Sequence, residues 1–188
     1  MSRRNSKLLV IDASIAKGSG DRRYNPIGSS PGDLSRKCLV AVREEKHIAV
    51  FSCLLRREWR NHASLYSTEW LKAMERKNLT ADNEGEEFSG LLDGARQSLA
   101  SENHRAALAK DFHLVKSALA TGQTILSNER KLPTLVATVC RTITEFTALY
   151  YANPAVEEDA CILWIKAGAE KDAERRIDVW AESHRGSD

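Results

Sequence analysis

The chain has 188 residues, of which 42% are hydrophobic and 29% are charged. This length suits one domain with a sizeable core, and this composition excludes a wholly disordered chain. The formal net charge of +2 is too small to indicate a nucleic-acid-binding protein by itself. The charges are unevenly distributed, however, because the first 62 residues contain 13 Lys and Arg against 6 Asp and Glu. A polyanion would therefore meet the N-terminal third first.

The apolar segments and the cysteines indicate where the protein works. No stretch approaches the ~18 apolar residues that a membrane helix needs. The run Leu8–Ile11 is too short for the core of a signal peptide. The four cysteines (Cys38, Cys53, Cys140 and Cys161) stand far apart and form no C-x-x-C motif, which favours reduced thiols over disulfides or a zinc site. We therefore expect a cytoplasmic protein with no membrane partner.

Short apolar runs alternate with helical periodicity along the chain. The runs predict buried parallel strands, because both of their faces are apolar, over residues 7–11, 47–51 and 124–127. Helical spacing of apolar residues covers most of the rest: 31–45, 53–77, 91–99, 113–120, 133–146 and 155–183. The remaining segments predict a loop at 17–33, a solvated link at 78–90 and an interruption at 150–154. Gly122 is expected to end the helix before it in the left-handed conformation.

Strands that alternate with helices predict an α/β fold in which helices sandwich a parallel sheet. We expect residues 1–150 to form the domain proper and residues 151–188 to form a helical C-terminal extension packed on it. Ligands of such sheets bind at the carboxyl ends of the strands. The residues that directly follow each predicted strand are therefore the first candidates for a functional site.

Four acidic residues are candidates for this edge of the sheet. Asp12 directly follows the first strand, and Glu129 lies two residues beyond the third. Asp111 is expected to open the helix that leads into the third strand, and Glu58 lies about two turns into the helix after the second. Carboxylates that converge in this way repel each other unless a cation binds between them, and Mg²⁺ and Mn²⁺ prefer oxygen ligands. The alternative is that each acid is a helix cap or a surface charge.

Three segments, taken in order, resemble the PIN-domain nuclease family. Leu8-Leu-Val-Ile-Asp-Ala-Ser14 resembles the family's opening strand, which ends in an acid followed two residues later by Ser or Thr. Leu54-Leu-Arg-Arg-Glu-Trp59 is similar to the helix that supplies the second acid. The segment from Lys110 to Glu129 resembles the second half, in which an acid, an apolar helix and a strand precede a Ser/Thr-x-acid turn.

This resemblance implies a PIN-like fold and a metal-dependent nuclease, most often an endoribonuclease and often the toxin of a toxin–antitoxin pair. It implies Mg²⁺ or Mn²⁺ held by four catalytic carboxylates: Asp12, Glu58, Asp111 and Glu129. Ser14 would orient a carboxylate or a metal-bound water, and Asn128 would lie beside the ligands without an assigned role. The implied partners are an RNA substrate, an antitoxin protein and a second copy of the chain.

Two features depart from the family pattern. Glu129 stands where the family more often has Asp, and the chain is longer than a minimal toxin. The additional length lies in an acidic link near residues 82–93 and in the helical tail after Pro154, and both additions weaken the toxin assignment more than the nuclease assignment. The alternatives are a nuclease that acts on DNA or on a particular nucleic-acid structure, and a PIN-like module that binds nucleic acid or protein without cutting it.

Basic residues and one histidine accompany the acids. Arg56, Arg60 and Lys17 are candidates for a rim that binds phosphates, and the alternative is that they form solvated helix faces. His113 follows Asp111 by two residues and is a candidate base. A supporting role beside the carboxylates is favoured for it, because bound metal ions supply their own hydroxide.

Overall fold

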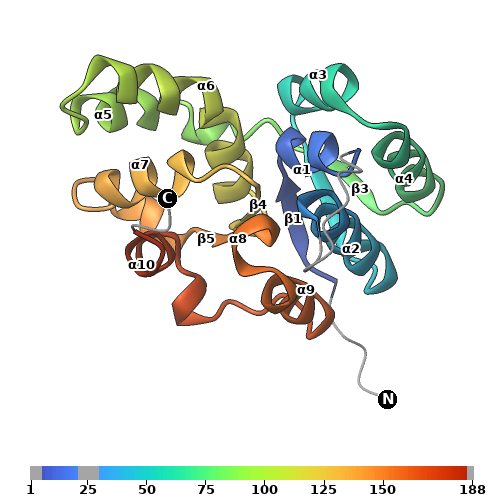
Figure 1. The fold of residues 1–188 in the computed structure, drawn as a ribbon. Helices are drawn as coiled ribbons and strands as arrows, with labels where there is room; N and C mark the ends of the chain where they lie inside the picture. Colours follow the sequence, from blue (N-terminus) through green and yellow to red (C-terminus); the bar gives the residue numbers. More distant parts are fainter. Residues whose placement is uncertain (1–5, 21–29, 186–188) are drawn as a thin grey trace.

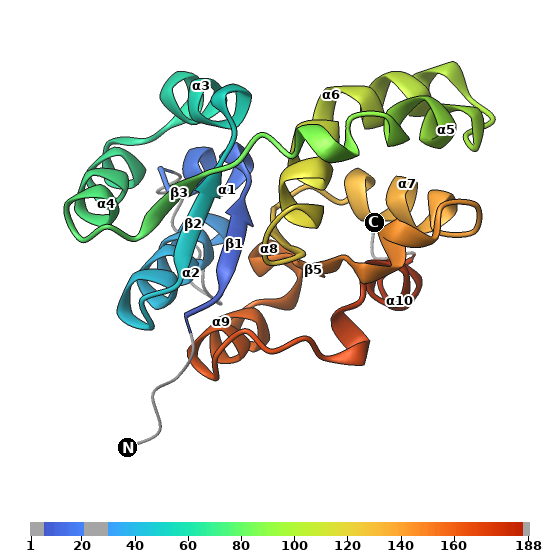
Figure 2. The ribbon, with the colours of Figure 1, turned by 180° about the vertical axis from the view of Figure 1, so that it is seen from behind.

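The structure is a computed structural model that describes residues 6–20 and 30–185 (Figure 1). The described residues contain a five-stranded sheet in which every neighbouring pair is parallel. Its strands are β1 (Leu8–Ile11), β2 (Ile48–Phe51), β3 (Thr80–Asp82), β4 (Thr124–Leu126) and β5 (Tyr150–Ala152). Helices flank this sheet (Figures 1 and 2). The predicted α/β fold with a parallel sheet between helices is thus confirmed.

The strand order is β3-β2-β1-β4-β5. The chain moves outward from β1 through β2 to β3, and it then returns to the other side of β1 to form β4 and β5. The two directions diverge between β1 and β4. In open parallel sheets this is the switch point, where a crevice forms at the carboxyl ends of the strands because the loops on either side lead to opposite directions.

The helices fill the connections between strands. Between β1 and β3 the chain forms α1 (Ala13–Gly18), α2 (Pro31–Glu44), α3 (Cys53–His62) and α4 (Leu65–Arg76). Between β3 and β5 it forms η1 (Glu86–Phe88), α5 (Leu91–Gln97), α6 (Glu102–Leu119), α7 (Lys131–Val139) and η2 (Thr144–Ala148). After the sheet come α8 (Pro154–Glu157), α9 (Asp159–Lys166), η3 (Ala173–Arg175) and α10 (Ile177–Ser183).

The core lies on both faces of the central strands. Leu9, Val10 and Ile11 of β1 are fully buried, as expected for a strand covered by helices on both sides. Two buried tryptophans also join helices to this core by hydrogen bonds. The indole of Trp59 donates to the carbonyl of Ile11 at 2.8 Å, and that of Trp70 donates to Leu39 at 2.6 Å. Their polar atoms are thereby satisfied inside the apolar layer.

Three differences from the prediction concern a helix break and two short strands. The expected single helix over 53–77 is two helices, because Ala63 is extended and the Ser64 side chain caps α4 by accepting from Ser67 N–H. The expected link at 78–90 contains β3, and the expected interruption at 150–154 contains β5. Both strands have only three residues, so they are too short to show a periodic pattern.

Two further differences concern the helix that precedes β4. It begins at Glu102, so Asp111 lies in the middle of α6 and does not open a helix. Gly122 does not adopt the left-handed conformation, which Gln123 adopts instead with φ 62°. Gly122 is required for space, because an added Cβ would lie 1.8 Å from the carbonyl oxygen of Leu8.

The C-terminal segment is part of the sheet and of both helical layers. The domain boundary predicted at residue 150 falls inside β5, the edge strand. Beyond β5, α9 packs on α2 and α10 packs on α7 (Figure 1). The carboxylate of Glu157, whose side chain is 9% exposed, secures this segment, since it accepts from Arg175 at 2.9 and 3.0 Å and from Trp180 at 2.5 Å. Residues 151–185 therefore complete the fold.

All four cysteines are free. Cys38 and Cys161 are buried, Cys140 is half-buried and Cys53 is exposed. Reduced thiols were expected from their spacing, and two of them lie in the core. Within residues 6–20 and 30–185, no helix is both long enough and apolar enough to span a membrane.

We expect protein stability to fall as the pH drops below about 6.5, because of His47. This buried imidazole accepts from the backbone N–H of Lys7 at 3.1 Å and lies 3.1 Å from the carbonyl of Ile165. Burial lowers the pKa of His47 below its ordinary value of 6.5. The unfolded chain therefore binds the proton before the folded protein does, and acid favours unfolding by up to about 1.4 kcal/mol per pH unit.

Urea unfolding at a series of pH values from about 7.5 down to about 5 measures this slope. The variant His47→Gln removes the titrating ring and should show a flatter dependence over the same range. Equal slopes for the wild type and the variant would contradict the assignment to His47. The range stays above the pKa of most carboxylates, which reduces their contribution.

Candidate active site

Asp12 lies at the carboxyl end of β1, at the switch point of the sheet. Its N–H donates to the carbonyl of Leu126 on β4 at 2.9 Å, and the residue occupies the N-cap position of α1 without a side-chain capping bond. The residue as a whole is 7% exposed. Its Oδ2 accepts from the hydroxyls of Ser14 at 2.5 Å and Ser127 at 2.6 Å. Its Oδ1 has no hydrogen-bond partner among the described residues, so one oxygen is held and the other is available to a ligand.

The loop after β4 is tied to the start of α1 by the same hydroxyls. The N–H of Asn128 donates to Ser14 Oγ at 3.0 Å, and the N–H of Glu129 donates to Ser127 Oγ at 3.0 Å. The amide of Asn128 donates to the Ser14 carbonyl at 3.3 Å and to Ser35 Oγ at 3.1 Å. These bonds hold the two strand ends in one orientation. Ser127 is a functional candidate that sequence reasoning missed, although it is the serine of the Ser-x-acid turn.

Asp111 faces Asp12 and Glu129 from α6. Its side chain is 24% exposed and lies 3.6 Å from the ammonium of Lys110. Burial raises the pKa of Asp111 above its ordinary value, and the negative charges of Asp12 and Glu129 raise it further. The positive charges of Lys110 and His113 act in the opposite direction. The Asp111 carboxyl therefore lies near enough to Asp12 and Glu129 for their charges to act on it.

Glu58 has a different neighbour. Its carboxylate oxygen lies 3.1 Å from Nε2 of His113, which joins α3 to α6. The His113 ring is 6% exposed, and its Nδ1 lies 3.1 Å from the carbonyl of Lys110. Nε2 is buried and forms no hydrogen bond of ordinary geometry, so the contact with Glu58 is electrostatic in character when the ring is protonated. The structure thus places His113 in a supporting position between two helices.

The three basic candidates lie in two kinds of surroundings. Arg56 pairs with Asp82 at 2.7 Å and with Glu75 at 3.0 Å, and its guanidinium lies over the ring of Phe51. Arg60 and Lys17 are exposed and have no ion-pair partner among the described residues. A bound phosphate would therefore meet Arg60 and Lys17 more readily than Arg56, which is already neutralised.

The carboxylates do not form a compact cage. Among the described residues, no group of three or more His, Cys, Asp or Glu side chains is arranged to hold one metal ion. Magnesium in proteins is often held by only one or two carboxylates together with water and substrate phosphates. An available Oδ1 on Asp12 and the unfavourable charge at Asp111 fit such a cation, because it would ligate the first and relieve the repulsion at the second.

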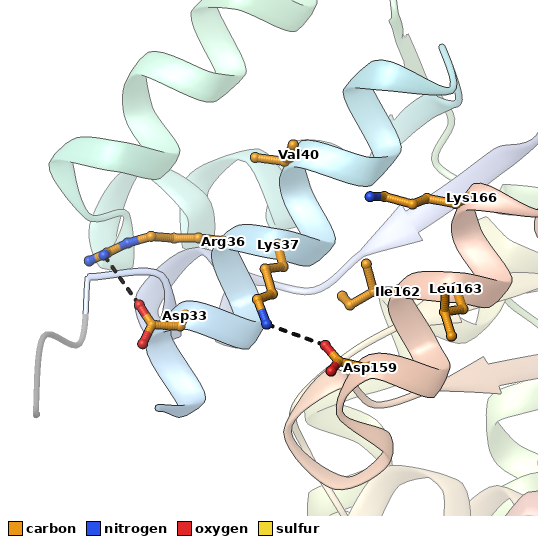
Figure 3. Close-up of a pocket in the computed structure, with 8 residues that line it drawn as sticks. All are labelled: Asp33, Arg36, Lys37, Val40, Asp159, Ile162, Leu163 and Lys166. Atoms are coloured by element: carbon orange, nitrogen blue, oxygen red, sulfur yellow. Dashed lines mark hydrogen bonds and ion pairs between the residues drawn. The ribbon is translucent and has the colours of Figure 1, made fainter. Parts of the chain in front are cut away.

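Two hollows on the described surface differ in their distance from these residues. One lies between α2 and α9, where Val40, Ile162 and Leu163 meet a pair formed by Lys37 and Asp159 at 3.3 Å (Figure 3). It contains none of the site candidates. The other runs beside α6, α7 and α10, and Asn128 and Glu129 form part of its lining. Of these two hollows, the second adjoins the candidate site.

Comparison of the chain with models of known protein families, with curated protein sequences and with solved structures gives no match.

We expect Asp111→Asn to raise the melting temperature at neutral pH without added metal. The raised pKa of Asp111 means that its ionised form is disfavoured in the folded protein. The neutral amide removes this cost, so the gain should be present above the ordinary carboxyl pKa and should vanish as the pH falls below it. Thermal unfolding at about pH 7 and about pH 3 measures the gain at neutral pH and its disappearance in acid. A lower melting temperature at neutral pH would mean that the pair with Lys110 outweighs burial and repulsion.

Proposed function

We propose that this protein is a metal-dependent nuclease of the PIN type that hydrolyses RNA. The observation that carries the proposal is the carboxylate of Asp12. It lies at the switch point of a parallel sheet, two serines hold one of its oxygens, and the other oxygen has no partner among the described residues. That second oxygen is not among the buried atoms without a partner, so it is open to solvent and a hydrated cation could reach it.

The proposed roles follow from the geometry. Asp12 and Asp111 would hold the divalent cation, with Glu129 as a more distant ligand. When bound, a Mg²⁺ or Mn²⁺ ion supplies a polarised water and stabilises the charge that develops on the phosphate. Ser14 and Ser127 keep the Asp12 carboxylate in one orientation. Arg60 and Lys17 would attract the phosphate backbone, since both cations are exposed.

A second candidate function is binding of nucleic acid without cleavage. The observation that favours it is the position of Glu58, which lies against His113 on α6 and is not among the charges that raise the pKa of Asp111. A site that lacks its fourth carboxylate would still present cations and carboxylates at the sheet edge, but it would hold a metal less tightly.

A cleavage assay decides between the two functions. The protein is incubated with single-stranded RNA and with single-stranded DNA of the same sequence, in Mg²⁺, in Mn²⁺ or with EDTA. Our proposal expects RNA fragments in the presence of either metal and none with EDTA. Cleavage of DNA alone would change the substrate class. Binding of RNA without fragments in every metal would support the second candidate function.

A further inference from the structure

The groove beside the candidate site has a volume of about 890 Å³ and runs between α6, α7 and α10. In both views α7 lies between α6 and α10 (Figures 1 and 2). Asn128 and Glu129 line one part of the groove, so it is continuous with the loop that holds Asp12. Apolar side chains, Ala107, Leu135 and Val156, line another part.

Aromatic rings connect the groove to the site loop. The half-exposed His184 lines the groove and stacks on Trp180, with ring centres 4.2 Å apart and planes 17° apart. Trp180 in turn packs edge-on against Tyr151 at 4.8 Å, and the Tyr151 hydroxyl donates to the carbonyl of Glu129. Trp180 and Tyr151 are buried, although Trp180 also lines the groove, so the half-exposed His184 presents the more accessible ring. The two buried rings hold the ring of His184 in a fixed position relative to the site.

The charged groups that line the groove are mainly cationic. Lys131 and Arg185 are exposed, and neither has an ion-pair partner among the described residues. His104 is exposed on the opposite side, on α6. Glu129 is the one acidic residue among the described lining residues, and it lies at the site end of the groove. The groove therefore combines free cations with apolar walls and one stacked ring.

We infer that this groove binds a single-stranded polynucleotide and leads it to the carboxylate site, an inference that rests on the proposed nuclease function. Lys131 and Arg185 contact phosphates, and His184 offers a ring on which an unpaired base stacks. A duplex keeps its bases stacked on each other, so it would use the cations but not the ring or the apolar walls. Both RNA and DNA supply the phosphates and unpaired bases that this contact requires.

Binding measured in EDTA tests the inference separately from cleavage. Fluorescence anisotropy is recorded for a labelled single-stranded RNA, the DNA of the same sequence, and a duplex, at several salt concentrations. The first variant is Lys131→Ala with Arg185→Ala. The matched control is Arg76→Ala with Lys77→Ala, which removes two exposed cations at the end of α4, on the other side of the sheet (Figure 1).

We expect the groove variant to bind single strands at least about tenfold more weakly than the wild type and to lower the salt slope by about 1.4. The control variant should bind as the wild type does. His184→Ala should weaken single-strand binding about tenfold with the salt slope unchanged, and His184→Phe should restore it, because the contribution comes from stacking. Melting temperatures of all variants show whether α10 remains folded.

Three results would overturn the inference. The first is equal binding by the groove and control variants, and the second is a wild-type protein that binds no single strand in EDTA. The third is displacement of the RNA by polyglutamate with no effect of His184→Ala, which would identify an acidic polypeptide as the occupant. None of these three results bears on the cleavage assay, which tests the nuclease function separately. If the wild-type protein binds single strands through the groove but cleaves no RNA in either metal, the nuclease function is refuted and the groove inference stands.

Discussion

Replacing Asp12 with asparagine is expected to reduce metal-dependent RNA cleavage by about 10²- to 10³-fold, with the fold retained. The amide oxygen of asparagine can accept hydrogen bonds from the hydroxyls of Ser14 and Ser127, as Oδ2 of Asp12 does. The amide nitrogen then occupies the place of Oδ1. Because an NH₂ group donates and cannot ligate a cation, the variant loses the ligand while it keeps the shape.

The melting temperature of Asp12→Asn should change little in the absence of metal. The loss of a charge-assisted hydrogen-bond acceptor destabilises the fold, while the loss of repulsion toward Asp111 offsets part of that cost. Cleavage rates at saturating Mn²⁺, together with thermal unfolding, measure both quantities. Full activity of Asp12→Asn would remove the mechanism proposed for this site.

Glu129→Gln provides a graded comparison for Asp12→Asn. The backbone of Glu129 is fixed by Ser127 and Tyr151, but its side chain is exposed and has no partner among the described residues. A long free side chain loses more rotamer entropy when it ligates a cation. The glutamine variant should therefore cleave faster than Asp12→Asn and need more metal. Equal loss at saturating metal would place Glu129 among the direct ligands.

Gly122→Ala is expected to destabilise the protein by more than about 4 kcal/mol or to prevent folding. The added methyl carbon would lie 1.8 Å from the carbonyl oxygen of Leu8 and 2.8 Å from its carbonyl carbon. Both atoms belong to the backbone of β1, which cannot turn aside as a side chain can. Relief requires that β1 or the loop before β4 move, and β1 is the central strand of the sheet.

Gly90→Ala is the matched control, because no atom lies within 4 Å of the position that its Cβ would occupy. Its backbone is already in the right-handed helical region, with φ −65° and ψ −17°, so alanine should be tolerated or slightly stabilising there. Soluble expression and urea unfolding of the two variants measure the difference. Similar stability for both would show that the loop at Gly122 yields without cost.

The features that the sequence by itself determined are those encoded over a few neighbouring residues. Both faces of β1, β2 and β4 are apolar, so these runs predict buried strands wherever the chain places them. Asp12 follows β1 directly, and the carboxyl ends of parallel strands share one edge, so its place at the crevice follows from connectivity alone. The same reasoning located Glu129.

The features that only the tertiary structure decided depend on residues far apart in the sequence. β3 and β5 have three residues each and exist because they pair with β2 and β4. Glu58 lies against His113 because α3 meets α6, a contact that the pattern of either helix alone does not encode. The contact of Glu58 with His113 and the groove beside α7 form where distant segments meet, and local periodicity carries no information about such meetings.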